Sequence, residues 1–150
     1  MIYLGADHRG LQLKEQIKKY LESVDIEAED LGAYTLDKND DYTDVAQDVA
    51  RYVRLKKENI GFLFCGSGVG VDIVANKHQD IRSALCFNKD VAKQSREHIS
   101  CNVACIPSDF VSFDEAKDIV LTFIKASFSF EERHVRRLSR IVNMEGRGLV

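Results

Sequence analysis

The sequence predicts an α/β protein in which a parallel sheet of about five strands carries helices on both faces. Short apolar runs alternate along the chain with longer segments whose apolar residues recur every three or four positions. This alternation is typical of a parallel sheet, because each crossover between parallel strands needs a connection that is usually helical. The 150 residues suit one domain, 1–150, with a single core.

The individual elements follow from the spacing of the apolar residues. Strands are expected at residues 2–6, 27–31, 60–65, 82–87 and 102–106. Helices are expected at residues 13–24, 45–57, 89–98, 116–124 and 131–144, with a short helix that ends at residue 77. The second of these helices would carry Lys56 and Lys57 in its last turn, where cations interact favourably with the helix dipole. The polar segment 33–43 before it is expected to be a loop.

Composition and charge exclude several classes of function. The net charge of −3 gives no general attraction to nucleic acid or to an anionic membrane. No apolar segment approaches the roughly 18 residues that a membrane span needs, and the first residues lack the pattern of a signal peptide. The four cysteines show no secreted disulfide framework, so we expect reduced thiols in a cytoplasmic protein.

Ligands of open α/β sheets bind at the carboxyl edge, where the strands end. Three polar segments are expected there: Asp7-His8 after the first strand, residues 65–70 after the third, and residues 95–102 just before the fifth. Asp7 and His8 together offer a carboxylate and a titratable imidazole. Asp7 is also well suited to capping the N-terminus of the following helix.

Residues 65–70, Cys-Gly-Ser-Gly-Val-Gly, carry the clearest signal of catalytic chemistry. Their glycines allow successive backbone N–H groups to converge on an anion. The positive potential is expected to lower the pKa of Cys65 and favour its thiolate, a suitable base beside amides that stabilise an enolate oxygen. The alternative is an inert cysteine in a tight turn. A dinucleotide site fits poorly, because Val71 occupies the place of the third glycine in that motif.

His98 ends one predicted helix and, without further context, is simply a partner for the helix dipole. With Cys101 and Cys105 it matches no zinc spacing, and a fourth ligand is missing. We therefore expect no metal and no cofactor.

The last predicted helix, 131–144, is amphipathic, with arginines on one arc and apolar residues opposite. Guanidinium groups bind phosphate oxygens bidentately, so we expect this stripe to bind phosphate. Nucleic acid is disfavoured because no stacking aromatic surface accompanies the stripe. The arginines are Arg133, Arg136, Arg137 and Arg140, and the apolar residues are Val135, Leu138, Ile141 and Val142.

A family resemblance covers residues 5 to about 142. The motifs that carry it are Gly5-Ala6-Asp7-His8-Arg9-Gly10, Asp30-Leu31-Gly32, Asp41-Tyr42, Cys65-Gly66-Ser67-Gly68-Val69-Gly70, Ala75-Asn76-Lys77, Ser95-Arg96-Glu97-His98, Asn102-Val103, and Arg133-His134 with Arg137. In this order and spacing, the chain resembles the type B ribose-5-phosphate isomerases, a family that includes galactose-6-phosphate isomerase subunits.

The resemblance implies a Rossmann-like three-layer α/β/α sandwich with an extended C-terminal helix. It implies an enzyme of the pentose phosphate pathway that interconverts ribose 5-phosphate and ribulose 5-phosphate through an enediolate. The expected assembly is a homodimer, sometimes paired into tetramers, with each active site shared between two subunits and no metal.

Roles for individual residues are likewise implied by the resemblance. Cys65 would be the base and His98 would assist ring opening, while Asp7 and His8 would contact the sugar. The enediolate oxygen would be held by Ser67 and the amides of the glycine loop. Arg133 and Arg137 would bind phosphate, reaching into the partner's site. The loop residues concerned are Gly66, Ser67, Gly68, Val69 and Gly70.

Three positions depart from the family pattern. Ile99 replaces the usual Asn, Thr43 replaces the usual Pro, and Asp109 stands where a phosphate-binding Arg is usual. A carboxylate near a phosphate dianion would weaken binding. We expect either that the loop turns Asp109 away, or that Arg136 and Arg140 supply the missing positive charge.

Two alternatives to a ribose-5-phosphate isomerase stay open on the sequence. One is an isomerase of another aldose phosphate, such as allose 6-phosphate or galactose 6-phosphate. The other is a non-catalytic protein that binds a sugar phosphate.

Overall fold

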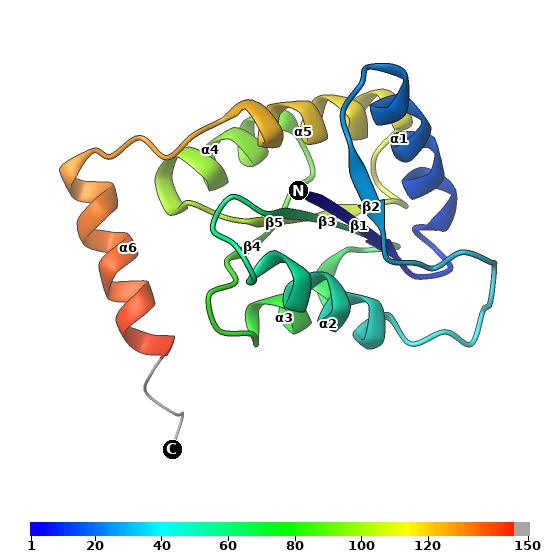
Figure 1. Ribbon diagram of the computed structural model, residues 1–150, viewed down its shortest axis with the longest axis horizontal. Coiled ribbons are helices and arrows are strands. Elements are labelled where there is room, and N and C mark those ends of the chain that lie inside the picture. The colour runs from blue at the N-terminus through cyan, green and yellow to red at the C-terminus, as the bar shows by residue number, and fades with distance from the viewer. Residues whose placement is uncertain (146–150) are drawn as a thin grey trace.

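The computed structural model describes residues 1–145, which form one parallel five-stranded sheet and six helices (Figure 1). The strands are β1 (Ile2–Ala6), β2 (Ala28–Asp30), β3 (Ile60–Cys65), β4 (Ser83–Leu85) and β5 (Val103–Pro107), in the order β2-β1-β3-β5-β4. The helices are α1 (Leu11–Ser23), α2 (Tyr42–Val53), α3 (Val69–Asn76), α4 (Lys89–Ile99), α5 (Phe113–Lys125) and α6 (Glu132–Glu145). The predicted α/β class is confirmed; residues 146–150 of the expected domain lie outside the described part.

Two hydrophobic cores lie on the two faces of the sheet. Helices α1, α4 and α5 cover one face, where the rings of Phe62 and Phe123 meet edge to face at 5.5 Å. Helices α2 and α3 cover the other face, where Val49 and Leu63 are fully buried. The central strand β3 is buried along its whole length, which explains its continuous apolar run.

The strand register decides which segments meet at the carboxyl edge. Cys65 lies opposite Pro107, and Ala6 lies opposite Phe64, so the ends of β1, β3 and β5 meet at one edge. Residues 95–102, however, lead into the first residue of β5. Since α4 runs back from the carboxyl edge, they lie at the amino edge, and their expected position at the carboxyl edge is wrong.

Two expectations about helix ends are also wrong. Helix α2 ends at Val53, so Lys56 and Lys57 follow the helix and are not in its last turn. Helix α1 is capped by Gly10 rather than by Asp7. A turn closed by the Gly10 amide on the Asp7 carbonyl (3.1 Å) separates Asp7 from the helix.

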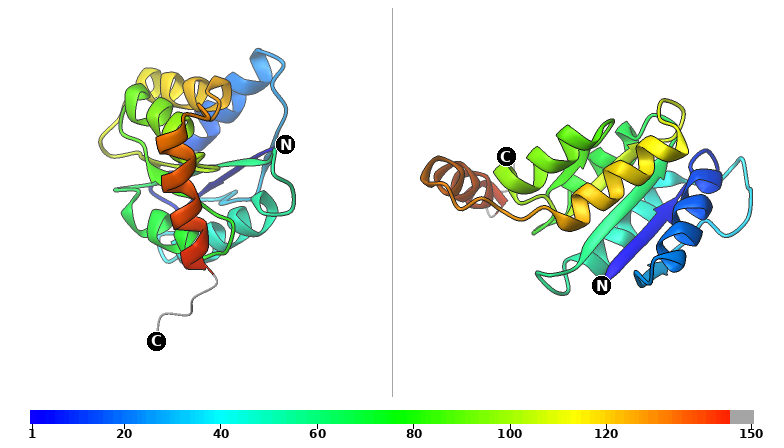
Figure 2. Two further views of the ribbon diagram at one scale, coloured as in Figure 1. Left: turned by 90° about the vertical axis from the view of Figure 1, so that its left-hand side faces the viewer. Right: turned by 90° about the horizontal axis from the view of Figure 1, so that it is seen from above.

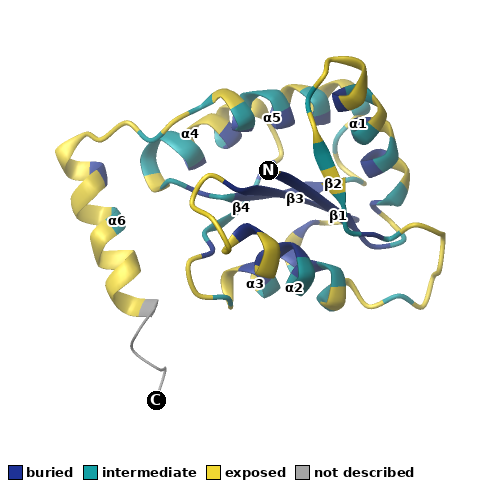
Figure 3. Ribbon diagram, in the orientation of Figure 1, coloured by how far each residue is buried: buried dark blue, intermediate teal, exposed yellow. Residues whose placement is uncertain are grey.

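Helix α6 stands apart from the layered body, beside α4 (Figure 2). Most of its surface is exposed, including the apolar residues Val135, Ile141 and Val142 (Figure 3). His134, by contrast, is only 3% exposed, and Leu138 is half-buried. An amphipathic helix whose apolar face meets water is typical of an element that packs against another chain. Within residues 1–145, no helix is long and apolar enough to cross a membrane.

A buried lysine ties α1 to β2 and offers a test of the fold. Lys14 is fully buried, and its Nζ donates to Asp30 Oδ1 (2.6 Å) and to the Ala33 carbonyl (2.7 Å). Lys18, which is partly exposed, donates to the other oxygen of Asp30 at 2.8 Å.

We expect Lys14→Met to lower the free energy of unfolding by roughly 3 kcal/mol, because one partner of a buried ion pair is lost. Lys18→Met, the matched control on the same carboxylate, should cost less than about 1 kcal/mol, because its ion pair is partly solvated. Urea denaturation measures both. Equal losses would contradict the structural importance of Lys14.

Candidate active site

The thiol of Cys65 and the carboxylate of Asp7 meet at the carboxyl edge of the sheet. Asp7 follows β1, and its amide donates to the Phe64 carbonyl at 3.2 Å. The Sγ of Cys65 donates to Asp7 Oδ2 at 2.9 Å, while Oδ1 accepts from the amides of Arg9 and Gly10. Both functional side chains are buried. A thiol and a fixed carboxylate at this separation suit proton transfer.

The environment of Cys65 contradicts the expectation of a lowered pKa. Burial and then the hydrogen bond and negative charge of Asp7 raise the pKa of the thiol to about 11. The backbone amides of Gly68 and Gly66 act in the opposite direction, as expected, but they are outweighed. In the free protein, the proton therefore stays on sulfur, hydrogen-bonded to a carboxylate that can accept it.

We expect Asp7→Asn to lower the pKa of Cys65 from about 11 toward its ordinary value of 9.0. The change removes the negative charge that opposes the thiolate, while burial remains. The pH dependence of alkylation by iodoacetamide measures this, with Cys65→Ala giving the background. The control Asp40→Asn, whose carboxylate contacts His8, should leave the profile unchanged. An unshifted or raised midpoint in Asp7→Asn would contradict this account.

Residues 66–70 turn from β3 into α3 through three glycines. Gly68 adopts a left-handed φ of 74°, which side chains tolerate poorly, and it caps α3. At Gly70, a Cβ would approach the ring of Tyr42 to 2.7 Å. Ser67 is exposed beside these glycines. These glycines form a tight turn at the start of α3, and the binding of an anionic oxygen by its amides stays a prediction.

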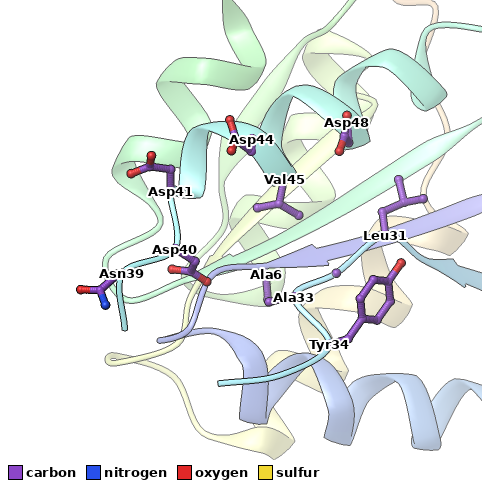
Figure 4. Close-up of a pocket in the computed structure, with 11 residues that line it drawn as sticks. Ala6, Leu31, Ala33, Tyr34, Asn39, Asp40, Asp41, Asp44, Val45 and Asp48 are labelled. Carbon is purple, nitrogen blue, oxygen red and sulfur yellow. The ribbon is translucent and has the colours of Figure 1, made fainter. Parts of the chain in front are cut away.

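His8 borders an acidic pocket over β1, β2 and α2. Its Nδ1 lies 2.6 Å from Asp40 Oδ1, a contact that fixes the imidazole. The pocket has a volume of about 440 Å³, and several carboxylates surround it (Figure 4). Carboxylates accept hydrogen bonds from hydroxyl groups but repel phosphate. The acidic residues that line the pocket are Asp40, Asp41, Asp44 and Asp48.

Asp109 has a partner that lies far away in the sequence. Its carboxylate forms an ion pair with the guanidinium of Arg9, 100 residues away in sequence. The Asp109 amide also donates to the Gly66 carbonyl at 3.0 Å, so this carboxylate stays beside the glycine loop. The loop thus does not carry Asp109 away; instead, Arg9 neutralises it.

The remaining site residues form a second group around α4 and α6. The rings of His98 and His134 stack with centroids 4.3 Å apart, and Nδ1 of His134 lies 2.7 Å from Ser129 Oγ. Burial, and then the adjacent His98, hold the pKa of His134 below its ordinary value. The adjacent Arg133 donates to Glu131 at 2.9 Å, so this arginine has an acidic partner in the residues that lead into α6.

A single chain does not unite the two groups. His98 and the residues of α6 lie toward the amino edge and beside α4, while Cys65 and Asp7 lie at the carboxyl edge. The strand β5 alone separates these edges by about 13 Å, given its five residues and the usual rise of a strand.

Comparison with known proteins decides the family. Residues 2–141 match the family model described as Ribose/Galactose Isomerase. This chain belongs to that family. A probable ribose-5-phosphate isomerase B from Mycoplasma pneumoniae is 39% identical over 144 residues, covering 96% of this chain and 94% of that protein. Ribose-5-phosphate isomerase B from Escherichia coli K12 is 35% identical, covering 97% of each chain.

Solved structures of ribose/galactose isomerases agree with the fold described above. The crystal structure of ribose-5-phosphate isomerase B from Mycoplasma genitalium with bound ribulose-5-phosphate matches with a TM-score of 0.92 and 39% identity. The match covers 97% of this chain and 96% of that one. The resemblance stated from the sequence motifs is confirmed, as is the Rossmann-like sandwich.

Proposed function

We propose that this chain is an isomerase that interconverts ribose 5-phosphate and ribulose 5-phosphate, with Cys65 as the base. The observation that carries the proposal is the Cys65–Asp7 hydrogen bond at the head of a glycine loop. Support also comes from relatives that bear the name ribose-5-phosphate isomerase B over nearly the whole chain. The aldose–ketose reaction needs one base and a site for an anionic oxygen, and Cys65 and the glycine loop would supply them at this edge.

Proton transfer accounts for the whole reaction. Asp7 accepts the thiol proton, and the Cys65 thiolate then removes the proton from C2 of the open-chain aldose. The negative charge passes to the C1 oxygen of an enediolate, which the amides of residues 66–70 and the Ser67 hydroxyl stabilise. The same sulfur returns the proton to C1, and the hydroxyl proton of O2 moves to O1, which leaves the ketose. Asp7 then returns its proton to Cys65, which restores the starting state.

Ring opening and part of the phosphate binding are proposed to come from a second subunit. His98, Arg133 and Arg137 belong to the group around α4 and α6, away from Cys65 in the same chain. We propose that a homodimer brings His98 and these arginines of one subunit to the Cys65 of the other, where His98 assists ring opening. The exposed apolar residues of α6 would be covered in the same contact. A tetramer of two such dimers would leave this site unchanged.

A panel of ribose 5-phosphate, allose 6-phosphate and galactose 6-phosphate tests the substrate. Ribose 5-phosphate should show the highest kcat/KM. Preference for a hexose phosphate would show that the substrate is another aldose phosphate. Binding without conversion of any sugar would favour the non-catalytic alternative.

A further inference from the structure

Arg9 lies directly on the glycine loop that follows Cys65. A Cβ at Gly66 would come within 2.6 Å of Nε and 2.8 Å of Cζ of Arg9, so the absence of a side chain makes room for the guanidinium. The Arg9 backbone is fixed, because its amide donates to Asp7 Oδ1 at 3.0 Å. The Asp7 carboxylate thus contacts both the Cys65 thiol and the Arg9 backbone, and the Arg9 guanidinium lies against the loop that follows Cys65.

The guanidinium of Arg9 keeps donors available. Its side chain is 57% exposed, and one terminal nitrogen pairs with Asp109. Among residues 1–145, Nε and the other terminal nitrogen of Arg9 donate no hydrogen bond. An ion pair this exposed is weak, so a phosphate dianion can compete with Asp109 for the guanidinium of Arg9.

Charge is divided across the site. Asp40, Asp41 and Asp44 line the pocket on the side of β1 and β2, which suits hydroxyl groups. Arg9 lies on the opposite side, over the ends of β3 and β5, because it contacts Gly66 and Asp109. A sugar phosphate has hydroxyl groups at one end and a dianion at the other, which matches this division of charge.

We propose that Arg9 binds the phosphate of the substrate from the same chain as Cys65, and that Asp109 positions its guanidinium. This inference rests on the proposed sugar-phosphate isomerase function. It explains how a site with a carboxylate at residue 109 accepts a dianion: the pair is neutral, and the guanidinium offers free donors in a planar fork that matches phosphate oxygens.

Inorganic phosphate, as an inhibitor competitive with ribose 5-phosphate, probes the site directly. Arg9→Gln should raise its inhibition constant by about 10-fold or more, the effect of losing a hydrogen bond to a charged group. KM for ribose 5-phosphate should rise similarly, with a smaller change in kcat. Arg51→Gln is the matched control, since Arg51 forms an exposed ion pair with Asp48 at 3.4 Å. If Arg9→Gln behaves like Arg51→Gln in both constants, the proposal is overturned.

A charge exchange tests the role of Asp109. Arg9→Asp places two carboxylates beside the loop and should abolish phosphate inhibition. Adding Asp109→Arg should restore inhibition substantially and lower KM again. If the double variant remains as weak as Arg9→Asp, then Asp109 does not position the cation.

Binding and turnover separate the two proposals. Calorimetric titration with phosphate needs no turnover. A wild-type protein that binds phosphate through Arg9 but converts no sugar would overturn the isomerase function and leave the anion site. Normal conversion with unchanged Arg9→Gln constants would overturn the role of Arg9 alone.

Discussion

Cys65→Ser is expected to lower turnover of ribose 5-phosphate by about 1,000-fold, within the usual range for a general base. A serine hydroxyl retains the hydrogen bond to Asp7, but it is far less acidic than a thiol and forms no effective base. The fold and sugar binding should persist, because the change replaces one atom. Initial rates measure turnover, and calorimetric titration with ribose 5-phosphate measures binding.

Cys86→Ala serves as the control for this result. Cys86 is fully buried in the core under α1, α4 and α5, whereas Cys65 belongs to the core on the other face of the sheet. Its variant should keep a normal kcat when corrected for folded protein. Near-normal turnover in Cys65→Ser would show that another group moves the proton.

Mixing two inactive variants is expected to restore activity if the site is shared between subunits. Cys65→Ala and Arg137→Ala should each be inactive alone. In a heterodimer, one of the two sites joins an intact Cys65 to an intact Arg137 from the other chain. Random exchange should therefore recover about a quarter of the wild-type activity, given an isologous dimer.

The control for this mixture pairs two residues that contact each other within one chain. Cys65 and Asp7 are 2.9 Å apart, so both belong to the same chain's half of the site. Mixing Cys65→Ala with Asp7→Asn should recover nothing. If the Arg137 mixture also stays inactive after subunit exchange is demonstrated, the shared site is wrong.

The fold was largely predictable because it depends on local periodicity. The strands β1 and β3 have the predicted bounds, since each is a buried apolar run followed at once by polar or glycine residues. The ends of α1 and α2 were less predictable. The turn at residues 7–10 and the start of α2 at Tyr42 depend on hydrogen bonds and packing that no local pattern reveals.

The site was predictable only in part, because its charges act over long sequence separations. The glycine loop indicated anion binding, but the pKa of Cys65 is raised first by its burial and then by Asp7, 58 residues away. The Arg9–Asp109 pair spans 100 residues. Arg9 lies within the motif that runs from Gly5 to Gly10, yet no residue near it in the sequence indicates that Asp109 is its partner. Residues 95–102 were wrongly expected at the carboxyl edge. The order of elements already indicates the amino edge, because these residues lead into the start of β5.

The most direct test of the central claim is NMR observation of ribose 5-phosphate incubated with the purified wild-type protein. We predict that ribulose 5-phosphate forms at a rate proportional to protein concentration, that the same equilibrium ratio is reached from either sugar, and that Cys65→Ala forms no product at a comparable rate. Ribose 5-phosphate that stays unconverted, or conversion that is equally fast with Cys65→Ala, would contradict the account.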